Sequence, residues 1–103
     1  MASVDVTIAD NVISGSPRNG IRLEGQGNWI ADNMVNRCDS AGVHVSGSTN
    51  VVERNRIGHN TGNGIFFDNA IGPHVFRGNV LRGNLSAPIA GATGNTDGGG
   101  NVL

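Results

Sequence analysis

Residues 28–49 read NWIADNMVNRCDSAGVHVSGST, and two features of this stretch return along the chain every 22 to 24 residues. The first is an asparagine with an apolar residue three positions before it and another two positions after it. The corner asparagines in this pattern are Asn11, Asn33, Asn55 and Asn79. The second feature, nine residues later, is a glycine followed by alternating apolar residues, as in Gly42-Val43-His44-Val45. A fixed period in the twenties is typical of stacked supersecondary units.

The apolar residues of each repeat predict short strands. They alternate in runs bounded by Gly, Asn, Asp and Ser, and they never recur with helical spacing over a useful window. Within 28–49 we expect strands at 29–31, 34–35 and 42–46, with Asn33 at a corner. Stacking triangular coils about 4.8 Å apart pairs each strand with its parallel copies. The expected fold is therefore all-β, a parallel β-helix (solenoid) of about four coils with 22–24 residues per coil.

Stacking would align equivalent residues into columns. The inward columns are apolar throughout: Ile8, Ile30, Val52 and Phe76; Ile13, Val35, Ile57 and Leu81; Ile21, Val43, Ile65 and Ile89; Leu23, Val45 and Phe67. We expect the corner asparagines to form a ladder for two reasons. Asparagine tolerates left-handed backbone angles at a sharp bend, and its amide can donate and accept hydrogen bonds along the stack.

The chain is expected to be one β-helix segment, residues 1–103. Its coils are predicted at about 6–27, 28–49, 50–73 and 74–100. Asn101-Val102-Leu103 matches Asn28-Trp29-Ile30, which predicts that 101–103 form a partial strand of a fifth coil. The stretch from Ala90 to Gly100 is rich in Gly, Thr and Asn and is expected to be a loop. Neither end shows a clear polar cap, which favours a longer β-helix or self-association.

The composition argues against several functional classes. The 103 residues carry a net charge of −1 with seven scattered basic residues, so no nucleic-acid footprint is present. No apolar run approaches the length of a membrane span, and no apolar h-region indicates a signal peptide. Cys38 is the only cysteine, so no internal disulfide is expected. His59 and His74 lack further ligands at zinc spacing, and we expect neither a metal nor another cofactor.

The repeated phrase, Ile-x-x-Asn-x-Ile/Val followed by Gly-Ile/Val-x-apolar, resembles the parallel β-helix repeats of the pectate-lyase-like superfamily from about Val6 to Ile89. The resemblance implies a right-handed parallel β-helix and favours an extracellular or cell-surface location. It does not define an activity, because the superfamily includes lyases, hydrolases, epimerases, phage tailspikes and adhesins. A leucine-rich repeat has a similar period, but its consensus Leu is replaced here by Val6, Asn28, Asn50 and His74.

The resemblance also implies that an active site would lie on the outward face of the Gly-Ile-x-Leu strand. The two outward columns of that face hold Arg22, His44 and Phe66, and Glu24, Ser46 and Asp68. If this face binds a saccharide, Phe66 would supply an apolar platform for a sugar ring and Arg22 would pair with a uronate carboxylate. His44 could move a proton near neutral pH. As a catalytic site, the acting residues would be His44, Asp68, Glu24 and Arg22.

A second outward stripe is apolar and predicts an interface through Trp29, Val51, Val75 and Met34. We expect a non-catalytic structural or saccharide-binding segment of a larger surface, phage or polysaccharide-processing protein. Its expected partners are polysaccharide and either further copies or the remainder of a longer β-helix, without nucleic acid or membrane. The alternative is a carbohydrate-active enzyme, a polysaccharide hydrolase, lyase or epimerase, with a shallow groove on the Gly-Ile-x-Leu strand face.

Overall fold

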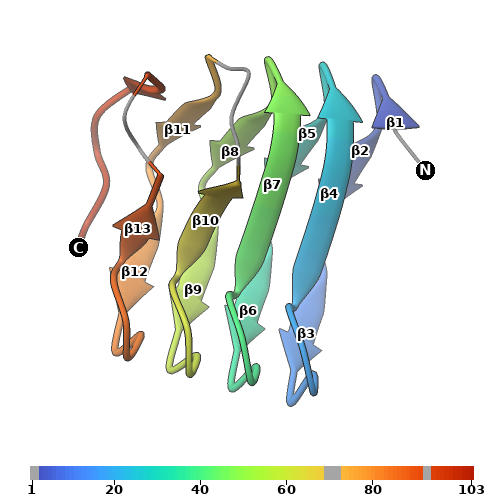
Figure 1. The fold of residues 1–103 in the computed structure, drawn as a ribbon. Coiled ribbons are helices and arrows are strands. Elements are labelled where there is room, and N and C mark those ends of the chain that lie inside the picture. The colour runs from blue at the N-terminus through green and yellow to red at the C-terminus, as the bar shows by residue number, and fades with distance from the viewer. Residues whose placement is uncertain (1–2, 69–72, 92–93) are drawn as a thin grey trace.

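The computed structural model describes residues 3–68, 73–91 and 94–103. Within these ranges the chain contains strands and turns without helices, wound as a parallel β-solenoid of about four coils (Figure 1). The predicted all-β fold is therefore confirmed. The two described ends of the chain lie at opposite ends of the stack, so each coil contacts only the coils before and after it.

Three parallel sheets form the three sides of the solenoid. Sheet A contains β1 Ser3–Val4, β4 Ile21–Gln26, β7 Val43–Ser48, β10 Ile65–Asp68 and β13 Ile89–Ala90. Sheet B contains β2 Thr7–Ala9, β5 Trp29–Ala31, β8 Val51–Glu53, β11 Val75–Arg77 and β14 Thr96–Asp97. Sheet C contains β3 Val12–Ser14, β6 Met34–Asn36, β9 Arg56–Gly58 and β12 Val80–Arg82.

The strand register confirms the predicted inward columns. Ile21 pairs with Val43, and Val43 pairs with Ile65, so that equivalent residues of successive coils are stacked. The middle coils bury these residues almost completely, with 0% of Val43 and Ile65 exposed. The residues at the two ends, Ile8, Ile13 and Ile89, are only partly buried because they have a neighbouring coil on one side. The alternation of inward and outward residues thus fixes which side chains reach the surface.

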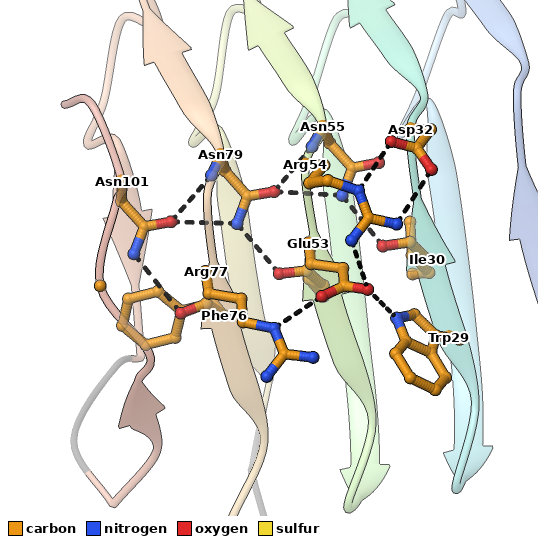
Figure 2. Close-up of polar contacts among 12 residues, drawn as sticks. Trp29, Ile30, Asp32, Glu53, Arg54, Asn55, Phe76, Arg77, Asn79 and Asn101 are labelled. Carbon is orange, nitrogen blue, oxygen red and sulfur yellow. Dashed lines mark hydrogen bonds and ion pairs between the residues drawn. The ribbon is translucent and has the colours of Figure 1, made fainter.

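The predicted asparagine ladder is present between sheets B and C. The Oδ1 atom of Asn55 accepts hydrogen bonds from the backbone N–H and the side-chain Nδ2 of Asn33, both at 3.0 Å. The same pair of bonds joins Asn55 to Asn79 and Asn79 to Asn101 (Figure 2). Each inner Nδ2 also donates to a backbone carbonyl, such as that of Ile30. The ladder therefore holds five residues, one more than the sequence pattern predicts.

The prediction that these asparagines take up left-handed backbone angles is wrong. The left-handed conformation falls on the residue before each one, with φ of 60° at Asp10, 57° at Asp32, 52° at Arg54 and 63° at Gly78. Asparagine occupies the next position because its Oδ1 accepts the backbone N–H of the preceding coil, while its Nδ2 donates to the asparagine of the next coil. The preceding position takes up the bend, which Asp and Gly tolerate better than most residues.

The end of the chain has a different register from the one expected. Asn101 continues the corner ladder, and Val102 pairs with Val80 of sheet C, so 101–103 do not begin a strand equivalent to 28–30. Asn95 takes the position of Asn28 instead, since its Oδ1 accepts the backbone N–H of His74. The stretch expected to be a loop also contains strand β14, paired with β11. Its glycine-rich sequence lacks the apolar alternation by which strands are recognised.

A second ladder, not anticipated from the sequence, lies between sheets A and B. Asn28 Oδ1 accepts the backbone N–H of Val6, and Asn50 Oδ1 accepts that of Asn28, both at 2.9 Å. In the next coil His74 replaces asparagine, and its Nδ1 accepts the N–H of Asn50 at 3.2 Å. His74 is fully buried and stacks on Phe67 with ring centroids 5.2 Å apart. This corner therefore tolerates a ring where the other keeps asparagine.

Candidate functional site

The outward face of sheet A brings together the residues predicted to form a site. β4 presents Arg22 and Glu24, and the strand register places Arg22 beside His44 of β7 and His44 beside Phe66 of β10. In the next column Glu24 lies beside Ser46 and Ser46 beside Asp68. The residues between them are buried in the core. Three adjacent strands thus carry the candidate residues on one exposed surface.

The His44 side chain contacts three neighbouring residues. Its Nε2 lies 3.1 Å from Asp68 Oδ2, and its Nδ1 lies 3.4 Å from Asn19 Nδ2. Because the Asn19 amide nitrogen is a donor and the Asp68 carboxylate is an acceptor, the imidazole can accept at Nδ1 and donate at Nε2. The ring also packs at a tilt against Phe66, with centroids 5.0 Å apart. Only 15% of the His44 side chain is exposed, so contacts on three sides fix its orientation.

Asn19 is a residue that the sequence reasoning missed. It lies in the turn before β4, where its Oδ1 also accepts the backbone N–H of Ala41 at 3.1 Å. Asn63 occupies the same position two coils later and accepts the N–H of Ala87. The available signal was the Asn-Gly step, which occurs at 19–20 and returns at 63–64.

Arg22 and Glu24 pair with each other along one strand. Arg22 Nη2 lies 3.0 Å from Glu24 Oε1, and the two side chains are 59% and 44% exposed. An ion pair so exposed to solvent contributes little to stability. Its groups remain accessible to a ligand, although each must exchange its present partner. A shallow hollow of about 400 Å³ adjoins Glu24 and Ser46 and extends to Val4 and Gln26 at the ends of the strands.

The outward face of sheet B carries a denser charge cluster around Glu53. This carboxylate is only 4% exposed, and it accepts hydrogen bonds from Trp29 Nε1 at 2.8 Å and Arg77 Nε at 2.6 Å (Figure 2). Arg54 Nη1 lies 2.9 Å from Glu53 and pairs on its other side with Asp32. Burial acts to raise the pKa of Glu53, but the hydrogen bonds and neighbouring charges outweigh it and leave the pKa below its ordinary 4.5.

This cluster changes the interpretation of the apolar stripe. The Trp29 ring is 43% exposed, yet its Nε1 is held by Glu53, a residue that the sequence analysis did not single out. The sequence did contain an indication of this cluster, because Glu53 precedes Arg54 directly and is aligned with Arg77 of the next coil. Asp32 and Arg54 form an ion pair between neighbouring coils, with Arg54 Nε 3.0 Å from Asp32 Oδ1. Association through Trp29 and the other residues of the stripe stays a prediction.

In the part of the chain that the structure describes, no three His, Cys, Asp or Glu side chains lie close enough together to hold a metal ion. Cys38 is completely buried, and burial raises the pKa of its thiol. His74 lies inside the core, where burial lowers its pKa, whereas His59 is exposed. Among the described residues we find no helix long and apolar enough to cross a membrane.

Comparison with known proteins places the chain in a family. Residues 1–98 match the family model described as periplasmic copper-binding protein (NosD). Because this match covers nearly the whole chain, the chain belongs to that family. No curated protein and no solved structure shows a significant match to the sequence. The family match, together with the stacked parallel strands, supports a right-handed parallel β-helix repeat protein, as the sequence pattern predicts.

Proposed function

We propose that this member of the NosD family is a non-catalytic saccharide-binding β-helix segment whose ligand lies across the outward face of β4, β7 and β10. The observation that carries the proposal is the ordered group around His44. The imidazole is fixed between Asp68, Asn19 and Phe66 while part of it remains exposed. A polar group held in one orientation beside an aromatic ring suits recognition of a sugar, which presents hydroxyls and an apolar face.

Each residue has a distinct role in this proposal. Phe66 provides the apolar surface, and His44 hydrogen-bonds a sugar hydroxyl when that hydroxyl replaces Asp68 or Asn19 at a ring nitrogen. Arg22 lies one coil from His44 and binds a carboxylate when the sugar is a uronate, because guanidinium and carboxylate form paired charge-assisted hydrogen bonds. The binding surface runs along the stack, so successive sugar units of a polysaccharide meet successive coils.

The pairing of the charged groups favours binding over catalysis. Arg22 is paired with Glu24, and His44 with Asp68, so neither carboxylate is held apart as an acid or base. The surface is also shallow, whereas the sites at which enzymes act on small molecules are usually clefts that bury most of the ligand. The alternative function is a polysaccharide hydrolase, lyase or epimerase. The observation that favours it is the His44–Asp68 pair, in which the carboxylate orients an imidazole that could act as a base.

The family description names copper, and the described residues do not fit that ion. Copper sites in proteins gather imidazole, thiolate and thioether ligands around one point. Here His44 is bound to Asp68, His74 is buried in the core, and the Cys38 thiol is buried with a raised pKa. We therefore assign no copper-dependent step to this chain. A periplasmic or cell-surface location is compatible with saccharide binding and remains part of the proposal.

Binding of oligosaccharides tests the proposed function. We expect a glycan array followed by calorimetry to identify an acidic or neutral oligosaccharide whose affinity falls about tenfold in Phe66→Ala, as expected for loss of an aromatic contact. His44→Gln should weaken binding similarly. Leu85→Ala, which removes an exposed apolar side chain elsewhere, is the matched control and should bind normally. Normal binding by both site variants would contradict the proposal, and turnover of the bound oligosaccharide would favour the enzymatic alternative.

A further inference from the structure

A groove with a cavity volume of about 230 Å³ lies on the outward face of sheet C, away from the His44 site. Met34, Arg56 and Val80 form one outward column beside it, in register across β6, β9 and β12. Gly58 and Arg82 belong to the neighbouring column. The groove exists because Gly58 has no side chain at the centre of this face. A Cβ atom there would approach the Arg82 carbonyl oxygen to 2.8 Å, so the backbone contact itself requires glycine.

The charges around this groove are unbalanced. Arg56 and Arg82 are exposed and form no ion pair or side-chain hydrogen bond with any described residue. No Asp or Glu lines the groove. Sheet B differs, because Arg54 and Arg77 each face a carboxylate there. Two arginines that line one hollow without a counter-charge can provide the donors that an oxyanion requires.

The geometry of the strands sets the distance that an anion must bridge. Arg56 and Arg82 lie on adjacent coils and are offset by two residues. A strand spacing of about 4.8 Å and a rise of about 3.3 Å per residue separate their Cα atoms by roughly 8 Å. Flexible arginine side chains from two such positions can reach opposite sides of one carboxylate, sulfate or phosphate. Each group presents several oxygens in the arrangement that guanidinium recognises.

The apolar side of the groove limits the rest of the ligand. Met34 is 38% exposed, and Val80 stands beside Arg56 on the next coil. These side chains offer a surface for the apolar face of a small ring, and the flexible thioether of Met34 can adapt to its shape. A cavity of this size falls below the usual range of about 300–1,000 Å³ for ligand pockets. It accommodates one sugar-sized unit.

We propose that this groove is a second ligand site, which binds the anionic group of a monosaccharide-sized unit between Arg56 and Arg82. The chemistry shared by its possible ligands is an oxyanion attached to a small, partly apolar body. The site lies on a different sheet from the His44 surface and uses none of its residues. It therefore does not depend on the proposed saccharide surface of sheet A.

Titration of the full chain with small sugars tests this site. The probes are glucuronate, glucose 1-phosphate, inorganic sulfate and, as the matched neutral sugar, glucose. Amide chemical shifts provide the readout, because the signals of β6, β9 and β12 distinguish this groove from sheet A. We expect the two anionic sugars to shift the amides of Arg56 and Gly58, with little effect from glucose. The response should weaken as salt is added. The carboxylate and phosphate arms identify which oxyanion is preferred, and the sulfate arm shows whether the sugar ring contributes.

Charge-neutralising variants provide the decisive comparison. Arg56→Gln and Arg82→Gln should each weaken binding of the preferred anion about tenfold or more, as expected for a hydrogen bond to a charged group. Arg18→Gln removes an exposed arginine at another corner and should leave the response of the sheet C amides unchanged. Equal binding of glucose and glucuronate would overturn the proposal. So would undiminished binding in both groove variants, or the absence of any shift on sheet C.

Discussion

Two of the side-chain ladders among the described residues hold neighbouring corners in different ways, while a third, with Asn60 and Asn84, follows sheet C. At the corner between sheets B and C, every position from Asn11 to Asn101 is asparagine, and each inner amide is bonded to both neighbouring coils and to a carbonyl. At the corner between sheets A and B, His74 interrupts the asparagines. Asn50 there donates its Nδ2 to the carbonyls of Gly25 and Ser46 rather than to the next side chain.

The difference shows what each corner requires. At both corners the side chain must carry a hydrogen-bond acceptor two bonds beyond Cβ, because that atom accepts the backbone N–H of the preceding coil. Asparagine Oδ1 and histidine Nδ1 both meet this requirement. Among the described residues, hydrogen bonds between side chains join successive asparagines in the ladder between sheets B and C, whereas Asn50 donates to backbone carbonyls. His74 Nε2 is buried and has no hydrogen-bond partner among the described residues. The second corner accepts substitution at the expense of an unsatisfied group.

Asn55→Ala should have the largest effect on this comparison. Asn55 is 1% exposed and makes four side-chain hydrogen bonds, with Asn33, Asn79 and Ile30. Its removal leaves several buried groups unpaired at about 1–3 kcal/mol each, so the free energy of unfolding should fall by more than about 3 kcal/mol. Urea unfolding followed by circular dichroism provides the measurement. A loss below about 1 kcal/mol would show that the ladder is not a major source of stability.

His74→Asn should sharpen the comparison through pH. Burial lowers the pKa of His74 from 6.5, so the unfolded chain binds this proton more readily than the folded chain. The stability associated with the neutral ring is therefore complete above pH 6.5 and declines as the pH falls toward the lowered pKa. The slope is at most about 1.4 kcal/mol per pH unit. Asparagine does not titrate, and it restores the residue type of the other positions in this ladder.

Unfolding experiments between pH 8 and pH 5 measure the difference between the two proteins. Wild type should lose stability over this range more steeply than His74→Asn. His44 and His59 are present in both proteins and cancel in the difference. The lowered pKa values of Glu53 and Asp32 concern pH below 4.5 and 3.8, outside the range. Parallel pH profiles would mean that His74 is not held neutral by the fold.

The sequence predicted the fold well because the solenoid repeats its requirements in every coil. Apolar alternation and a constant step identify columns such as Ile30 above Val52, and the structure stacks them in that register. The prediction failed where the repeat is degenerate. In the stretch from Ala90 to Gly100, Thr96 and Asp97 take the strand positions that Val75 and Phe76 hold one coil earlier, so no apolar residue distinguished Asn95 from Asn101 as the start of the next coil.

The candidate site was predicted only as a set of columns. Alternation places Arg22, His44 and Asp68 on one face, but it does not reveal which groups pair. Those pairings depend on rotamers and on residues outside the repeat phrase, such as Asn19 in the turn before β4. The cluster around Glu53 was missed for the same reason. Glu53 shares a column with Arg77, but its bond to Trp29 crosses to the neighbouring column, which alternation does not reveal.

Asn11→Ala should change the free energy of unfolding least, because Asn11 lies at the end of the ladder. Asn11 is exposed at the first coil, and its Oδ1 accepts no hydrogen bond from the described residues. It only donates, to Ala9 O and Asn33 Oδ1 at 3.1 Å. Water can replace an exposed donor, so the free energy of unfolding should fall by less than about 1 kcal/mol. If Asn11→Ala proved as costly as Asn55→Ala in the same urea titration, burial and two-sided bonding would not explain the strength of the inner ladder.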